Sequence, residues 1–193
     1  MSVTFPAPGR AHPKHQLESG VLMAPPVNAT KTEGIALAAV RFLLGFLWLQ
    51  NVGWKLPPDF SGVATFVRAG VEHPVFPPYS WILEHVIEPN IKLFGWGVLF
   101  LELSLAAFLL AGLATRLWAT IGVVQSLAIG LSVAAAPNEW GWSYWLMAAA
   151  HVAVAASPAA GRVGGLDGVL RQSIANSPYR GARGGRLYLR WLS

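Results

Sequence analysis

Cysteine is absent from the 193 residues of the sequence. This absence excludes disulfide bonds and thiol–disulfide catalysis, because both need cysteine sulfur. It also excludes an iron–sulfur cluster bound by cysteine and a haem attached covalently through cysteine. A chain without cysteine cannot carry out thiol chemistry alone.

Charged residues are also few, since 12% of the chain is Asp, Glu, Lys or Arg and 54% is hydrophobic. A soluble domain usually has about 25% charged residues. The composition therefore predicts an integral membrane protein whose first partner is the lipid bilayer. Tryptophans near the ends of the apolar segments are typical of the two bilayer interfaces: Trp48, Trp54, Trp81, Trp96, Trp118, Trp140 and Trp142.

The net charge of +5 does not indicate a nucleic-acid partner. Most basic residues lie in the two terminal segments or in the short turn at Arg116, and acidic residues gather in the segment between the first two apolar runs. This asymmetry follows the positive-inside rule. It predicts a multi-pass protein of the cell (plasma) membrane with cytoplasmic N- and C-termini and no nucleic-acid partner.

The four apolar segments predict an all-α membrane protein with a bundle of four transmembrane helices, and the second segment is the clearest, because it exceeds the roughly 20 residues that a spanning helix needs. Thr30 and Glu33 have the spacing of a capping box, which predicts the start of the first helix. The expected spans are residues 34–54, 92–116, 117–136 and 142–157. We expect a disordered cytoplasmic arm (1–33), a four-helix membrane domain (34–157) and a basic cytoplasmic tail (158–193). The outer loop (56–91) is expected to form short interfacial helices and to contain a helix stop at Pro89.

Glu102 lies near the middle of the second predicted span. An ionised carboxylate there costs about 2.5–3.5 kcal/mol, so its side chain is expected to face protein or water. Arg41 and His151 lie in other spans at compatible depths, and we expect one or both to pair with Glu102. This network is interpreted either as structural or as a proton relay or quinone-headgroup site. Arg41 alone could instead extend to the inner interface.

Two aromatic residues on bundle-facing stripes, Trp48 and Tyr144, are expected to form the walls of a quinone site and to donate hydrogen bonds to it. Haem is not expected, because a b-type haem needs two facing histidines and His151 is the only one at membrane depth. His73 and His85 in the outer loop are interpreted as solvated residues, so no metal site is predicted.

Several segments in fixed order resemble the DoxX family, and most of all its DoxD-like small membrane subunit of thiosulfate:quinone oxidoreductase. The resemblance covers roughly residues 34–170. The segments are Arg41-x-x-x-Gly45 with Lys55, Leu83-Glu84-His85-Val86-Ile87-Glu88-Pro89-Asn90, Phe94-Gly95 with Glu102, Gly112-Leu113-Ala114-Thr115-Arg116, Trp140-Gly141-Trp142-Ser143-Tyr144, and Gly161-Arg162 with Gly165-Leu166-Asp167.

This resemblance implies a four-helix membrane subunit for quinone-dependent sulfur or thiol redox chemistry, which works beside other membrane or membrane-associated subunits. The residues also bear on two further functions. A non-catalytic anchor or assembly subunit of a larger respiratory complex fits the short length and the basic tail. A small transporter fits less well, because the sequence has no broken spanning helix and no inverted repeat.

Overall fold

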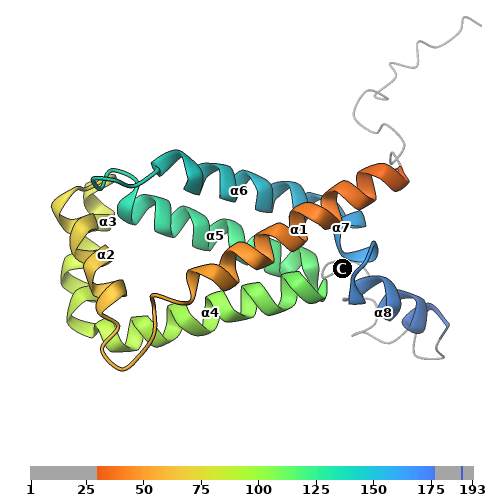
Figure 1. The fold of residues 1–193 in the computed structure, drawn as a ribbon, viewed down its shortest axis with the longest axis horizontal. Helices are drawn as coiled ribbons and strands as arrows, with labels where there is room; N and C mark the ends of the chain where they lie inside the picture. Colours follow the sequence, from red (N-terminus) through yellow and green to blue (C-terminus); the bar gives the residue numbers. More distant parts are fainter. Residues whose placement is uncertain (1–29, 177–187, 189–193) are drawn as a thin grey trace, which may run out of the picture.

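The structure is a computed structural model that describes residues 30–176 and Tyr188. All regular elements within these residues are helices, as predicted (Figure 1). The long helices of the bundle are α1 (Lys31–Asn51), α4 (Ile91–Ala111), α5 (Thr115–Val133) and α6 (Gly141–Ala156). The shorter elements are α2 (Ser61–Glu72), α3 (Pro77–Ile82), the π-helical turn η1 (Leu83–Ile87), the 3₁₀ turn η2 (Glu88–Asn90), α7 (Ala159–Arg162) and α8 (Leu166–Ala175).

The bundle has two different ends (Figure 1). The end covered by α2 and α3 is called the cap end here, and the end where α7 and α8 lie is called the tail end. Helix α1 begins at the tail end. The expected arm lies outside the described residues up to residue 29, as does most of the tail after residue 176.

The predicted capping box is present at the start of α1. The Thr30 hydroxyl accepts a hydrogen bond from the Glu33 amide at 3.2 Å, and the Glu33 carboxylate accepts one from the Thr30 amide at 2.5 Å. These two bonds satisfy backbone donors that would otherwise lack a partner at a helix start. The helix therefore begins at Lys31, about one turn before the predicted start of the span.

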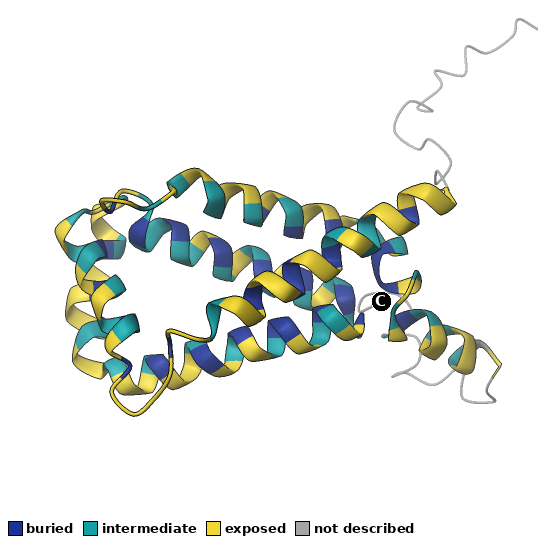
Figure 2. Cartoon of the chain, viewed as in Figure 1, coloured by how far each residue is buried: buried dark blue, intermediate teal, exposed yellow. Residues whose placement is uncertain are grey.

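Among the described residues, three helices are long and apolar enough to cross a membrane: Lys31–Asn51, Thr115–Val133 and the continuous helical segment Pro77–Ala111 that ends with α4. About a third of each apolar window is buried inside the protein, so most of its apolar surface faces outward (Figure 2). Phe42, Phe100 and Val124 are examples that expose more than half of their surface. Helix α6, with 16 residues, is about 24 Å long and shorter than the other three.

The tail half of the bundle has a closely packed apolar core. Gly45 allows α1 to approach α4, because an added Cβ would lie 2.9 Å from the backbone nitrogen of Leu110. Such close contact leaves no space for water between the two helices. The buried cluster consists of Leu44, Trp48, Leu105, Ala106, Leu109, Ala119, Val154 and Ala160.

The cap end is built from the segment between α1 and α4, where the sequence predicts short helices. Helix α2 buries Val63 and Val67, and the fully buried Phe60 ring lies so close to Gly95 that a Cβ on Gly95 would overlap it. The expected helix stop at Pro89 is wrong, because the chain continues through η2 into α4. Proline is tolerated here because the first turn of a helix does not need its missing amide donor.

Asp167 of α8 connects α8 to the turn between α4 and α5 at the tail end. Its fully buried carboxylate accepts hydrogen bonds from the amides of Ala114 and Thr115 at 2.7 and 2.9 Å, and so caps the start of α5. Its own amide donates to the Gly112 carbonyl at 2.8 Å, and the Tyr188 hydroxyl donates to the carboxylate at 2.5 Å. The first part of the predicted tail is therefore packed on the bundle.

Candidate functional site

A cavity of about 480 Å³ lies in the cap half of the bundle. This volume is in the range of ligand pockets, which are mostly apolar with a few polar groups. Its walls come from α1, α2, α3, η1, α4, α5 and α6. The lining includes apolar and aromatic residues (Trp48, Trp54, Val63, Phe66, Val67, Tyr79, Leu83, Ile87, Phe94, Val98, Ile129, Val133, Tyr144 and Met147) and polar ones (Asn51, Lys55, Glu102, Gln125, Ser126, Ser132 and Glu139).

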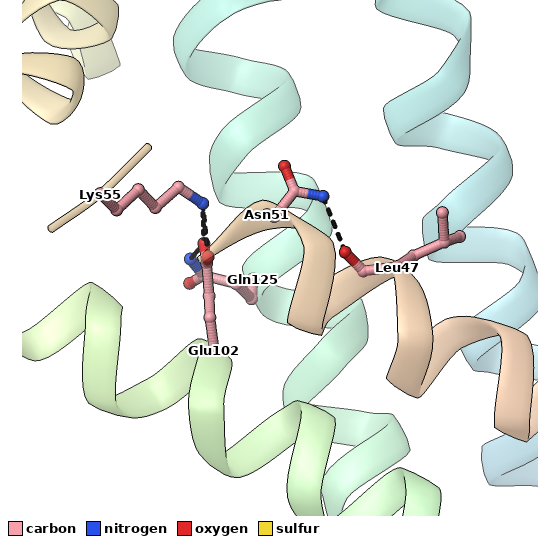
Figure 3. Close-up of polar contacts among 5 residues, drawn as sticks. All are labelled: Leu47, Asn51, Lys55, Glu102 and Gln125. Carbon is pink, nitrogen blue, oxygen red and sulfur yellow. Dashed lines mark hydrogen bonds and ion pairs between the residues drawn. The ribbon is translucent and has the colours of Figure 1, made fainter. Parts of the chain in front are cut away.

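A buried ion pair between Lys55 and Glu102 is the main polar feature of this cavity (Figure 3). The ammonium group of Lys55 donates to both carboxylate oxygens of Glu102, which is fully buried. The side-chain amide of Gln125 on α5 also donates to Glu102, at 3.4 Å. The pair thus keeps two charges out of water while each compensates the other.

The turn after α1 determines where Lys55 lies. Helix α1 ends at Asn51, whose side chain donates to the Leu47 carbonyl at 3.0 Å, and the Lys55 amide then donates to the Val52 carbonyl at 3.0 Å. This turn holds the Lys55 backbone beside the cavity, and the side chain extends across to Glu102 on α4 (Figure 3). The Lys55 ammonium also lies 4.5 Å from the ring centroid of Trp54, within cation–π range.

A second carboxylate lines the cavity at the connection between α5 and α6. Glu139 is half-buried there, and its carboxylate accepts a hydrogen bond of 2.5 Å from the Tyr144 hydroxyl on α6. The Glu139 amide donates to the Ala136 carbonyl at 3.2 Å, which fixes the turn. Two carboxylates from different parts of the chain thus share one cavity.

On the tail side of the cavity, Trp48 and His151 form a closed hydrogen-bonded pair. The Trp48 indole N–H donates to Nε2 of His151 at 3.0 Å, and Nδ1 of His151 lies 2.8 Å from the Met147 carbonyl oxygen. A carbonyl only accepts, so Nδ1 carries the hydrogen and both ring nitrogens of a neutral imidazole are used. His151 is fully buried and does not line the cavity.

The predicted pairing of Glu102 with Arg41 is wrong, and so is its pairing with His151. Arg41 is buried at the tail end, where one Nη donates to the Gly164 carbonyl at 3.0 Å. The prediction measured the depth of Arg41 from the expected start of the first span. In the structure, α1 extends past the end of α4 at the tail end (Figure 1), so Arg41 lies level with the turn after α4.

Three of the five predicted site residues line the cavity: Glu102, Trp48 and Tyr144. His151 lies behind Trp48, and Arg41 lies at the other end of the bundle.

Among the polar residues that the prediction did not assign to the site, Lys55 and Gln125 contact Glu102, and Glu139 bonds with Tyr144. A signal existed for two of them. Lys55 follows Trp48 by seven residues and so shares its helical face, and Gln125 lies on the stripe of small and polar residues in the third apolar segment. The period places Lys55 toward the bundle, but it does not show that Lys55, rather than Arg41 or His151, reaches Glu102. Glu139 lies in a turn and has no periodic signal.

Metal-ligating residues do not gather anywhere in the part of the chain that the structure describes, since no group of three His, Asp or Glu could hold an ion there. Comparisons of the chain with family models, with curated proteins and with solved structures give no match. The part of the chain that the structure describes is all-helical, with three helices apolar enough to span a membrane and a buried ion pair in a cavity of the bundle.

Proposed function

We propose that the chain is the membrane subunit of a quinone-linked oxidoreductase, similar to the DoxD-like small subunits of the DoxX family, and that it binds the quinone in the cap-half cavity. The observation that carries this proposal is the buried Lys55–Glu102 pair in a mostly apolar cavity. Charged residues at membrane depth are costly and usually mark a substrate or proton site.

A four-span bundle in the plasma membrane is part of this proposal. Helix α6 makes its most extensive contact with α5, which supports assigning it as the fourth span. Trp140 and Trp142, both exposed, lie at its cap-end start, where an interfacial aromatic belt is expected. Arg162 and Arg171 lie at the tail end, which we assign to the cytoplasm by the positive-inside rule.

The cavity residues fit a quinone headgroup, which is a flat ring with two acceptor oxygens. Trp48 and Trp54 offer aromatic walls, and Lys55, Gln125 and Tyr144 carry N–H or O–H donors. A quinone takes up two electrons and two protons to become a quinol. The electrons come from oxidation of a reduced sulfur compound on a partner subunit, such as two thiols that become one disulfide.

Glu102 is the group we assign to proton transfer at the ring. A carboxyl held within reach of a ring oxygen acts as a general acid when it is protonated and as a base when it is not. Lys55 holds the carboxylate in place and compensates its charge between the two steps. In this proposal the chain supplies binding, orientation and protons, and the sulfur chemistry belongs to the partner because this chain has no cysteine.

Tryptophan fluorescence tests this proposal on the purified chain, because quinones quench tryptophans that they contact and two tryptophans line the cavity. A short-chain benzoquinone is expected to quench saturably, and the double variant Lys55→Met/Glu102→Gln to bind about tenfold more weakly or worse. Trp140→Phe is the matched control, since Trp140 does not line the cavity and its loss should leave the Kd unchanged. Quenching that rises linearly without saturation would refute the quinone site and leave a non-catalytic anchor subunit.

A further inference from the structure

Glu139 and Tyr144 are not needed to hold the Lys55–Glu102 pair, yet both line the same cavity. Glu139 is half-buried in the turn between α5 and α6, at the cap end, whereas Glu102 is fully buried on α4. The Tyr144 hydroxyl donates to Glu139 at 2.5 Å, so the two form one continuous hydrogen-bonding unit. This unit reaches from the protein surface into the cavity.

Toward the tail end no comparable polar route runs through the described residues. The cavity is followed there by the apolar cluster around Leu105 and Leu109, which are both fully buried. The polar pair on that side, Trp48 and His151, has its indole N–H and both imidazole nitrogens engaged. A carrier that passes protons needs a group that can both accept and release one, and this pair has no free position for it.

Water can fill the space between the two carboxylates. The cavity is large enough for several water molecules, and Asn51, Gln125 and Ser132 supply polar groups along its wall. A chain of such waters would connect the Tyr144 hydroxyl with Glu102 without any movement of the helices.

We infer that Glu139 and Tyr144 form the proton path between the cavity and the solution at the cap end, so that the site exchanges protons there and not at the tail end. This inference rests on the proposed quinone site. A proton taken up by the Glu139 carboxylate passes to the Tyr144 oxygen while the Tyr144 hydroxyl proton moves into the cavity. Water then carries it to Glu102, and two such transfers balance the two electrons that a quinone accepts.

The test uses the purified chain in a lipid film on an electrode, which supplies the electrons and removes the need for a sulfur donor. The film contains a short-chain benzoquinone, and the rate of its reduction at the bound site is measured from the scan-rate dependence. Glu139→Gln is expected to slow this rate about tenfold or more, in line with the loss of an acid–base group, without changing the quinone Kd from the fluorescence titration. Glu139→Asp should recover most of the rate, and Glu84→Gln, an exposed acid outside the cavity, should have no effect.

Added formate separates proton transfer from structure. A small weak acid can replace a missing carboxyl in a proton path, so formate should raise the rate of Glu139→Gln and leave the wild type unchanged. A Glu139→Gln variant that binds quinone and reduces it at the wild-type rate would overturn the inference. So would a slow variant that has also lost quinone binding and that formate does not rescue, because Glu139 would then be structural. Absence of saturable binding in the wild type would instead refute the quinone site itself.

Discussion

Replacing Lys55 by methionine would leave the Glu102 carboxylate buried without its partner. Removing one member of a buried ion pair usually costs about 3–5 kcal/mol. The structure explains a cost of this size, because Glu102 is fully buried and Gln125 is its one other donor within reach among the described residues, at 3.4 Å. The charge left without a partner can be neutralised: a carboxylate takes up a proton, and an ammonium group releases one. For ordinary groups at pH 7 these steps cost about 3.7 and about 4.6 kcal/mol respectively, so the destabilisation by either single variant has a similar upper limit.

The double variant Lys55→Met/Glu102→Gln removes both charges and keeps a side-chain amide that can bond with Gln125. Replacing both members of a buried pair is often close to neutral. We therefore expect each single variant to lose about 3–5 kcal/mol and the double variant to lose less than either. For a chain of this size the single losses correspond to a fall in Tm of roughly 2–4 °C per kcal/mol.

Reversible unfolding of the purified variants in mixed micelles gives the coupling free energy from a double-mutant cycle. The exposed ion pair between Arg68 and Glu88 at the cap end is the matched control, and such pairs contribute about 0–1 kcal/mol. If the two single losses at Lys55 and Glu102 are additive, the two residues do not interact and the pairing is refuted.

Three further predictions concern packing, topology and the tail end. Gly95→Ala should destabilise the protein by about 1–3 kcal/mol because its Cβ would overlap a buried aromatic ring, whereas Gly97→Ala on the same helix has open space and should be neutral or slightly stabilising in the same unfolding assay. Single cysteines at Ser61 and Ser173 should be labelled from opposite sides of intact cells by an impermeant maleimide, and labelling of both from outside would contradict the topology. Asp167→Asn should cost about 1.5–3 kcal/mol by weakening charge-assisted bonds to two backbone amides, and an unchanged Tm would contradict its capping role.

Local signals in the sequence were sufficient to predict where α1 starts and that the regular elements are helices. The capping box at Thr30 and Glu33 depends on residues three apart, so it is visible without any tertiary information. The stop expected at Pro89 failed because the consequence of a proline depends on its place in a helical turn. The sequence places the proline but does not show that the turn before it continues into α4.

The need of Glu102 for a partner could be predicted, but the partner could not. An acid in an apolar segment must be compensated, and this follows from solvation energies alone. Which of Arg41, Lys55 and His151 becomes the partner depends on the position at which α1 packs along α4. That position is a property of the tertiary structure. The close approach at Gly45 sets that position and brings Lys55, not Arg41, level with Glu102.

The central claim, that the cap-half cavity is a quinone site, is tested most directly by photo-crosslinking. A photoreactive quinone analogue is irradiated with the chain in lipid, and the labelled peptides are identified by mass spectrometry. The account predicts labels on cavity residues from separate parts of the chain, such as Trp54 in the turn after α1, Phe66 of α2 and Met147 of α6, which excess unlabelled quinone should suppress. Labels confined to outward-facing residues such as Phe42 and Phe100, unaffected by the competitor, would contradict it.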